Sequence, residues 1–293
     1  MSLEAAVARV TGREVTSLRR VGGGDINDAY VAELDGGGRA FVKTRADAPA
    51  GEYEAEAAAL GWLGEPGGVG VPGVLGASDE LLALEWLEEG GRGDEAELGR
   101  GLAIVHLAGA ETFGGGAPRD AAGGAAPRDA AGGAAPLRIA RLALPNDPLD
   151  DWPEFYAERR LRPLIGPARL SAAGTRAVEA VCERIGEIAG PPEPPARLHG
   201  DLWSGNVLWS GDRPYVIDPI AYGGHREVDL AMLQLFGSPG PRFFAAYEDV
   251  APLADGWRDR VALYQLFPLL VHAALFGGGY AASVERAARK YAA

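Results

Sequence analysis

The stretch "LHGDLWSGNVLWSGDRPYVID", residues 198–218, bears most directly on the fold. It begins with a turn-prone segment, and two short apolar runs, VLW and YVI, then flank the polar turn SGDR. Apolar runs on both sides of such a turn predict a β-hairpin. A hairpin of this length would bring Asp218 back beside Asn206.

The spacing between Asp201 and Asn206 indicates a reaction class. An Asp followed five residues later by an Asn is the spacing of the kinase catalytic loop, where the Asp orients and deprotonates a hydroxyl and the Asn binds metal. Asn206 and Asp218 would offer the hard oxygen ligands that Mg²⁺ shares with phosphate. HGD or IDP alone could be a capped turn. The kinase hypothesis therefore depends on Asp201, Asn206 and Asp218 occurring together in this order and at this spacing.

Composition limits the partners and the compartment. The 293 residues carry a net charge of −13, which disfavours nucleic acid and anionic membranes as partners. Cys182 is the one cysteine, and the first residues lack a signal-peptide pattern, so we expect a cytoplasmic protein. The apolar stretch 263–276 is too short to span a bilayer and predicts a buried helix kinked or started near Pro268.

The N-terminal part of the sequence predicts a small antiparallel sheet. A short helix over 2–11 is followed by three strand-like runs at 15–21, 28–34 and 39–45. The last two runs are joined by DGGG (35–38), whose glycines suit a hairpin turn. We therefore expect an antiparallel meander.

A helix predicted over 52–64 places a carboxylate on an apolar face. Glu56 shares that face with Tyr53, Leu60 and Leu63. A carboxylate there requires a cationic or hydrogen-bonding partner. Lys43, in the third strand, can supply it, and a strand Lys paired with a helix Glu is the phosphate-positioning device of kinases.

Further along the chain, helical patterns predominate. A buried strand is predicted over 81–87, and a glycine-rich break follows it. Helical patterns then appear at 96–109, 151–164 and 171–190. Strands first and helices afterwards predict a two-lobed α+β protein, with a nucleotide-binding lobe over 1–88 and a catalytic and substrate lobe over 89–293.

One segment departs from this plan. Residues 114–136 contain near-copies of a short Gly, Ala, Pro, Arg and Asp unit. Such short repeats without large apolar residues cannot build a core, so we expect a low-complexity surface insertion.

Two further segments could contact a nucleotide. The sequence GGGDIN (22–27) joins the first two strands, so Gly23, Gly24 and Asp25 could offer backbone N–H groups to phosphates, although the G-x-G-x-x-G pattern is missing. A hinge next to the lobe boundary could offer backbone groups to adenine from Glu85, Trp86 and Leu87. This second hypothesis rests on position and not on residue type.

Four residues near the catalytic loop have less certain roles. Asp229 opens a predicted helix, and we expect it, like His199, to support the loop. Trp203 lies between the predicted base and metal ligand, where an indole could pack on a sugar or belong to the core. His225, in YGGHRE, follows further along the chain, and a sugar contact and a core position are equally open for it.

Several motifs together resemble the fructosamine kinase family, also called ketosamine 3-kinases. They are GGGDINDAY, FVKT, EYEAEAAAL, LHGDLWSGNVLW, VIDPIAYGGHREVDLAML and the run from RFFAAYEDV to LLVH. The resemblance covers nearly the whole chain except 114–136. HGDLWSGN followed by DPIAYGGHRE and DLA is more specific than the general aminoglycoside-phosphotransferase signature.

The resemblance implies a protein-kinase-like fold, ATP, Mg²⁺ and phosphoryl transfer to the 3-hydroxyl of a ketosamine. It implies Asp201 as the base, Asn206 and Asp218 as metal ligands and Lys43 on the phosphates with Glu56 beside it. It also implies "EWL" (85–87) at the adenine. Many eukaryotic members have a cysteine where this chain has Asp25, so no thiol switch is expected there.

Two alternatives stay open at this point. The same fold and chemistry could serve another acceptor, such as an amino alcohol or an aminoglycoside. The chain could instead be a nucleotide-binding pseudokinase, although Lys43, Glu56, Asp201, Asn206 and Asp218 are all present. The sequence leaves open the sugar, its amine carrier and the oligomeric state.

Overall fold

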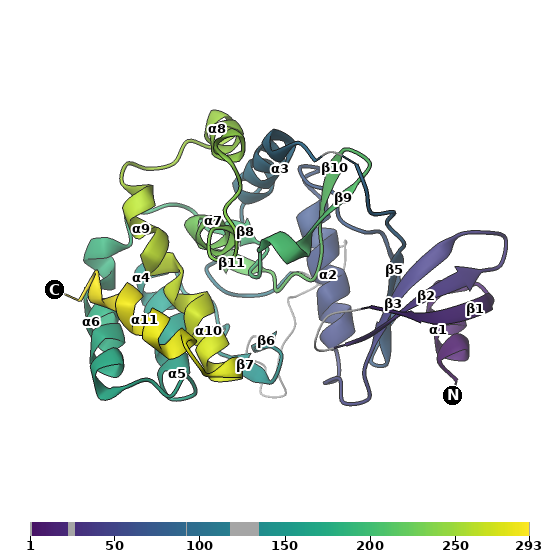
Figure 1. Ribbon diagram of the computed structural model, residues 1–293, viewed down its shortest axis with the longest axis horizontal. Coiled ribbons are helices and arrows are strands. Elements are labelled where there is room, and N and C mark those ends of the chain that lie inside the picture. The colour runs from purple at the N-terminus through teal and green to yellow at the C-terminus, as the bar shows by residue number, and fades with distance from the viewer. Residues whose placement is uncertain (1, 23–26, 92, 118–134, 293) are drawn as a thin grey trace.

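The computed structural model describes residues 2–22, 27–91, 93–117 and 135–292. Five strands form an antiparallel sheet in the order β1-β2-β3-β5-β4 at one end of the molecule (Figure 1). Their bounds are β1 Val15–Val21, β2 Asp28–Leu34, β3 Arg39–Thr44, β4 Val74–Ser78 and β5 Leu81–Glu85. The predicted meander of the first three strands is confirmed.

Two helices cover opposite faces of this sheet. Helix α1 (Leu3–Thr11) begins after Ser2, whose hydroxyl accepts a hydrogen bond from the Ala5 N–H at 3.3 Å, and it packs on the face that carries Val42 and Ala83. Helix α2 (Glu52–Gly64) packs on the other face, which carries Phe41 and Leu84. Neighbouring residues of a strand point to opposite faces, which explains the division.

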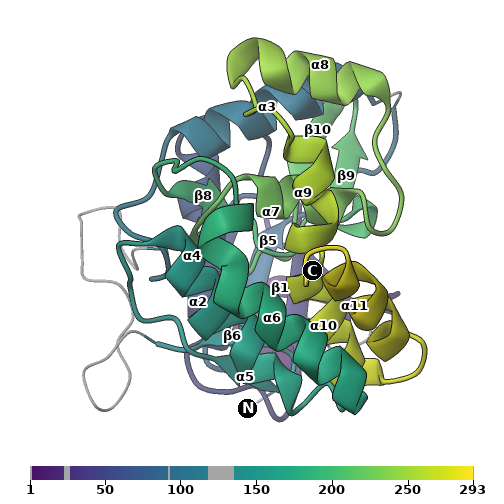
Figure 2. The ribbon, with the colours of Figure 1, turned by 90° about the vertical axis from the view of Figure 1, so that its left-hand side faces the viewer.

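The rest of the described chain is mainly helical (Figures 1 and 2). Its largest core is built around Trp152, Tyr156 and Tyr264. The helices are α3 Glu95–Leu107, α4 Trp152–Phe155, α5 Arg162–Ile165, α6 Ala172–Ile188, α7 Glu227–Leu233, α8 Pro241–Val250, α9 Trp257–Tyr264, α10 Leu266–Phe276 and α11 Tyr280–Arg289. The predicted α+β class is confirmed, whereas the lobe boundary at residue 88 stays a prediction.

The structure corrects one helical prediction in detail and confirms another, the helix that starts near Pro268. The helix predicted over 151–164 contains a π-helical segment, η1 (Tyr156–Leu161), between α4 and α5. The apolar stretch 263–276 divides at Gln265 into the end of α9 and all of α10. Pro268 therefore lies in the first turn of α10, where its missing N–H leaves no helical hydrogen bond unmade.

Short strands connect these parts. Strands β9 (Val207–Ser210) and β10 (Arg213–Val216) form the predicted hairpin. Strand β8 (Ala196–Leu198) pairs with β11 (Tyr222–Gly224), and β6 (Leu137–Ile139) pairs with β7 (Leu142–Leu144). A one-turn 3₁₀ helix, η2 (Ser204–Asn206), leads into β9. Among the described helices, none combines the length and the apolar character needed to cross a bilayer.

Candidate active site

The loop between β8 and β9 holds Asp201 against Asn206. The Asn206 side-chain amide donates to the Asp201 backbone carbonyl at 2.8 Å and to its carboxylate at 3.1 Å. Both contacts use the amide nitrogen, so the Asn206 Oδ1 atom is left to accept from a ligand. The five-residue spacing thus places an orientable carboxylate and an amide oxygen side by side.

The β9–β10 hairpin returns Asp218 to this loop. Val216 pairs with Val207, and the Ile217 N–H donates to the Asn206 carbonyl at 3.1 Å. Asp218 itself has a φ of 55°, a left-handed conformation that non-glycine residues rarely adopt. Such conformations are costly and occur often at functional sites, and this one turns the carboxylate towards Lys43.

Lys43 joins the sheet to the hairpin. Its Nζ atom lies 2.8 Å from Glu56 Oε1 and 2.9 Å from Asp218 Oδ1, and the residue is only 7% exposed. Burial lowers the pKa of Lys43, but the two carboxylates outweigh it, so the pKa is raised above its ordinary value. Burial raises the pKa of Glu56, and Lys43 opposes that rise. The close contacts indicate a charged Lys43–Glu56 pair.

These residues line one cavity of about 930 Å³. Its walls come from the sheet, from α2, from the catalytic loop and from the β6–β7 hairpin. Its polar lining includes Asn27, Lys43, Arg45, Glu56, Arg138, Asn146, Asp147, Asp201, Asn206 and Asp218. The sequence-predicted base, metal ligands and phosphate-binding pair are therefore brought together.

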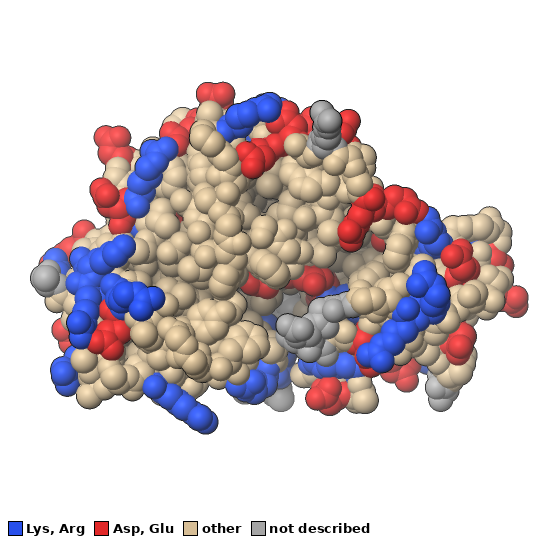
Figure 3. Space-filling model, viewed as in Figure 1, with Lys and Arg blue, Asp and Glu red and all other residues tan. Residues whose placement is uncertain are grey.

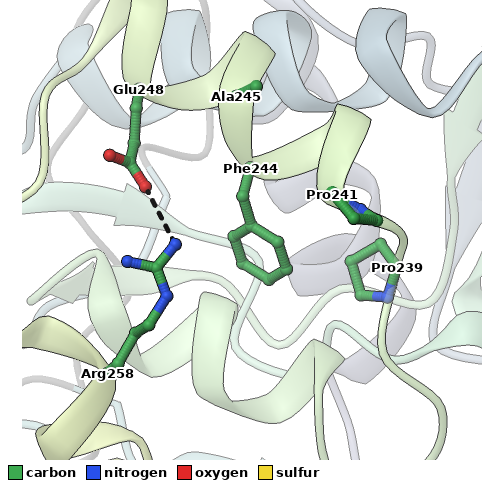
Figure 4. A pocket seen from close by; sticks show the side chains of 6 residues that line it. All are labelled: Pro239, Pro241, Phe244, Ala245, Glu248 and Arg258. Carbon is green, nitrogen blue, oxygen red and sulfur yellow. Dashed lines mark ion pairs between the residues drawn. The ribbon is translucent and has the colours of Figure 1, made fainter.

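A second hollow lies on the surface of α8 and shows no comparable chemistry (Figure 4). Pro239, Pro241 and Phe244 line its apolar side. Its charged groups, Glu248 and Arg258, lie 3.7 Å apart as an exposed ion pair. Such a pair contributes little, and we assign the hollow no function.

Helix α7 contacts the loop between β8 and β9 through the carboxylate of Asp229. The Asp229 carboxylate accepts from the His199 N–H at 2.7 Å and from the Gly200 N–H at 2.9 Å, and His106 Nε2 lies 3.2 Å away. Burial would raise the pKa of Asp229, but hydrogen bonding and charge from His106 lead the effects that lower it overall. This geometry suits the supporting role predicted for Asp229.

His199 is engaged through both ring nitrogens. Its Nε2 atom lies 2.9 Å from the Ile217 carbonyl and therefore donates, while its Nδ1 atom accepts from the Asp201 N–H at 3.3 Å. The imidazole links the loop before Asp201 to the end of the hairpin. A ring held in this way suits bracing better than proton transfer.

The family-model comparison decides the family. The fructosamine kinase model matches residues 2–293. This chain belongs to the fructosamine kinase family. The resemblance stated from the motifs is confirmed.

Related proteins agree with that membership. The chain is 33% identical to a protein of Synechocystis named probable ketoamine kinase, over 94% of this chain and 90% of the relative. It is 33% identical to a protein-ribulosamine 3-kinase of Arabidopsis thaliana, over 92% and 81%. A Thermobifida fusca crystal structure assigned to fructosamine-3-kinases is 44% identical, covers 99% of this chain and 98% of its own, and has a TM-score of 0.87.

The kinase-like fold extends beyond the family. A type I macrolide 2'-phosphotransferase covers 97% of this chain and 94% of its own at a TM-score of 0.61. At 19% identity, this likeness shows the fold alone. The predicted protein-kinase-like fold is confirmed.

Some predicted site residues lie away from the cavity or outside the described part. His225 is 2% exposed and stacks on Tyr264, with ring centroids 5.2 Å apart and planes at 17°. Burial lowers the pKa of His225 to about 4. His225 therefore belongs to the core. The sugar contact considered for it from the sequence is not supported, because it does not line the cavity. Gly23, Gly24 and Asp25 fall outside the described residues.

The predicted adenine hinge lies beside the cavity and is not part of its described lining. The Glu85 carboxylate accepts from the Gly73 N–H at 3.2 Å, and the Trp86 N–H donates to the Arg39 carbonyl at 3.3 Å. Leu87 follows, half-buried. Phe41, from β3, lines the cavity next to Trp86 and was not predicted.

Sequence reasoning also missed the wall after β7. Asn146 lines the cavity, and its side-chain oxygen accepts from the guanidinium of Arg160 at 2.7 Å. Arg160 lies fully buried in the π-helical segment, with the rings of Tyr222 and Phe155 4.1 and 4.5 Å away. The sequence RLALPNDP carries no charge pattern that marks this wall, so only the fold reveals it.

Proposed function

We propose that this chain is an ATP-dependent kinase that phosphorylates the 3-hydroxyl of ketosamines, the adducts of sugars on amines. The observation that carries the proposal is the meeting of Asp201, Asn206 and Asp218 with the Lys43–Glu56 pair in one cavity. The names of the ketoamine and ribulosamine kinase relatives support the acceptor class.

Lys43 is the cation for the nucleotide phosphates. It already lies between two carboxylates, and its three N–H donors can exchange the Asp218 contact for a phosphate oxygen. Glu56 would keep the ammonium in place when that exchange occurs. Catalysis of this kind depends on positioning and on electrostatic stabilisation.

The donor set fits Mg²⁺. Asp218 offers a carboxylate with a half-exposed side chain, and Asn206 offers an amide oxygen, whereas no cluster of three His, Cys, Asp or Glu fit for a metal occurs in the described ranges. One carboxylate and one amide oxygen match an ion that takes its remaining ligands from phosphate and water. When bound there, Mg²⁺ would neutralise charge that develops on the transferred phosphoryl group.

Asp201 acts on the acceptor. As the sugar hydroxyl oxygen attacks the γ-phosphorus, Asp201 accepts the hydroxyl proton. The bond between the γ-phosphorus and the β,γ-bridging oxygen breaks, and ADP leaves with that oxygen. The Asn206 contact keeps the carboxylate oriented towards the cavity before the acceptor arrives.

A repair role follows from the product. A phosphate at the 3-position becomes an allylic leaving group once the ketosamine enolises towards the amine-bearing carbon. Its loss destabilises the link between sugar and amine, so phosphorylation would lead to deglycation. We therefore infer that the reaction repairs glycated amines.

A kinase assay over a panel of ketosamines tests the proposal. Fructosamines and ribulosamines are incubated with ATP and Mg²⁺, ADP release is measured, and NMR gives the position of the new phosphate. We expect ketosamine-dependent ADP release and a 3-phosphate. Turnover of amino alcohols or aminoglycosides alone would point to the alternative acceptor, and ATP binding without turnover of any acceptor would point to a pseudokinase.

A further inference from the structure

Five aromatic side chains form a continuous row that starts at the catalytic loop. We call Trp203, Phe236, His272, Phe276 and Tyr280 the aromatic strip. Ring centroids lie 6.2 Å apart from Trp203 to Phe236, 4.9 Å from Phe236 to His272 and 5.6 Å from His272 to Phe276. Tyr280 closes the row at 5.1 Å from His272. The residues come from the loop, from the segment after α7, from α10 and from α11.

The strip is unusually exposed for large aromatic residues. Trp203 is 37% exposed, Phe236 36% and Phe276 64%. Each other exposed large apolar side chain in the described part of the chain is aliphatic and comes from β4 or α3. Charged side chains are scarce on the face that runs from the cleft over α10 (Figure 3). Contiguous apolar surface of this kind marks interaction sites.

Trp203 makes the strip continuous with the active site. It lines the same cavity as Asp201 and Asn206, and its ring packs edge-to-face with the ring of Phe236. A β-carbon placed on Gly205 would lie 2.3 Å from the Trp203 indole, so glycine at that position lets the indole lie against the loop. The first ring of the strip therefore has a fixed place beside the reacting centre.

His272 has a fixed orientation within the row. Its Nδ1 atom lies 2.7 Å from the Pro268 carbonyl, one turn earlier in α10, and therefore donates to it. The ring is thereby held between Phe236 and Phe276. The strip is a preformed surface, and a ligand would bind it without first ordering its central ring.

We propose that the aromatic strip is the subsite for the amine-bearing part of the acceptor, and that it selects ketosamines whose amine carries an extended hydrocarbon or aryl group. The inference rests on the proposed function, because the sugar must lie at Asp201 for the amine to reach Trp203. A protonated amine is attracted to the face of an indole, and a hydrocarbon carrier would cover the rings beyond it.

The test compares two ketosamines of the same sugar, one on methylamine and one on hexylamine. The methylamine adduct reaches no further than Trp203, whereas the hexyl chain extends past it onto Phe236. We expect the wild-type protein to prefer the hexylamine adduct in kcat/KM, mainly through KM. In Phe236→Ala, we expect this preference to fall about fivefold, as partial loss of one ring contact implies.

Leu107→Ala is the matched control. Leu107 is 60% exposed on α3 and lies outside the strip, so the preference should keep its wild-type value. Equal kcat/KM for both adducts in the wild type would overturn the proposal, as would an unchanged preference in Phe236→Ala. A change in the oligomeric state of Phe236→Ala with an unchanged preference would assign the strip to a second copy of the chain and also overturn the proposal.

Failure of this inference is distinguishable from failure of the proposed function. Turnover of the methylamine adduct by the wild-type protein tests the kinase activity alone. If that adduct is phosphorylated and the preference for hexylamine is missing, the strip proposal fails and the proposed function stands.

Discussion

Asp201 lies in a loop that partly removes it from water, and this affects its chemistry. Burial raises the pKa of its carboxyl, and electrostatic interactions with His199 and His272 and the hydrogen bond from Asn206 oppose the rise without cancelling it. A base is most effective when its pKa is near the working pH. Burial therefore makes Asp201 a stronger base than an exposed aspartate while Asn206 keeps it oriented.

Asp201→Asn should lower kcat by about 10²–10⁴-fold, the usual contribution of a general base, with the KM for ATP nearly unchanged. Because the active form is the carboxylate and its pKa is raised, wild-type kcat should begin to fall, as the pH is lowered, at a higher pH than for an exposed aspartate. A pH profile of kcat checks this. An unchanged kcat in Asp201→Asn would remove Asp201 from the role of base.

At position 43 the identity of the cationic residue, a lysine and not an arginine, should matter as well as its charge. Among the 28 lysines and arginines of the chain, only Lys43 and Lys290 are lysines. An ammonium is a compact point charge, whereas a guanidinium is a wide planar fork. Lys43→Arg should therefore keep the charge and still lower kcat/KM for ATP by about 10-fold or more, because the fork does not fit between Glu56 and Asp218.

Lys290→Arg, on the exposed end of the chain, is the control for Lys43→Arg and should leave steady-state kinetics unchanged. Wild-type kinetics in Lys43→Arg would mean that charge alone matters at this position.

At the scale of elements, α7 holds the loop between β8 and β9 through hydrogen bonds to Asp229. Two consecutive backbone N–H groups of the loop donate to the single carboxylate of Asp229. The same helix carries a second buried carboxylate, Glu227, which pairs with Arg260 at 2.6 and 2.9 Å. One helix thus supplies one acid to the loop and one acid to the core.

This arrangement makes a matched pair of variants. Asp229→Asn offers one acceptor oxygen where two are used, so one loop N–H loses its partner, and kcat should fall about 10- to 100-fold with the KM for ATP preserved. Glu227→Gln should lower the free energy of unfolding by a few kcal/mol, because it leaves Arg260 without its buried partner charge, and should preserve kcat. Steady-state kinetics and urea unfolding measure both. Equal effects of the two variants on kcat would make Asp229 a merely structural residue.

At the scale of the whole molecule, the sequence predicted those features that depend on residues close together along the chain. The strands 15–21 and 28–34 have the predicted bounds, and Lys43 meets Glu56 because a strand and the next helix are close along the chain. The hairpin also returned Asp218 to Asn206 as its length required.

Long-range packing explains what sequence reasoning missed. Lys43 and Asp218 are 175 positions apart, and no periodicity connects them. His225 is polar in the sequence, yet the fold stacks it on Tyr264 and places the Trp152 ring 5.9 Å away, and these two rings come from distant helices. The aromatic strip likewise gathers rings from separate elements. Such features depend on how elements pack against each other and not on the pattern within one element.

The residues proposed to bind ATP and Mg²⁺ come from both the sheet and the helical part of the molecule, so binding should stabilise the whole fold. Lys43 comes from the sheet, whereas Asn206 and Asp218 flank the hairpin. ATP with Mg²⁺ at about 100 times its Kd should add about 2.7 kcal/mol to the free energy of unfolding and raise Tm by about 5 °C. EDTA should remove most of this rise in Tm because it removes the cation. Asp218→Ala should do the same because it removes a carboxylate that would bind the cation. Asp249→Ala, exposed on α8, should keep the full rise. Differential scanning fluorimetry measures these Tm shifts. If ATP raised Tm equally in the presence of EDTA, the phosphates would bind here without a cation between Asn206 and Asp218.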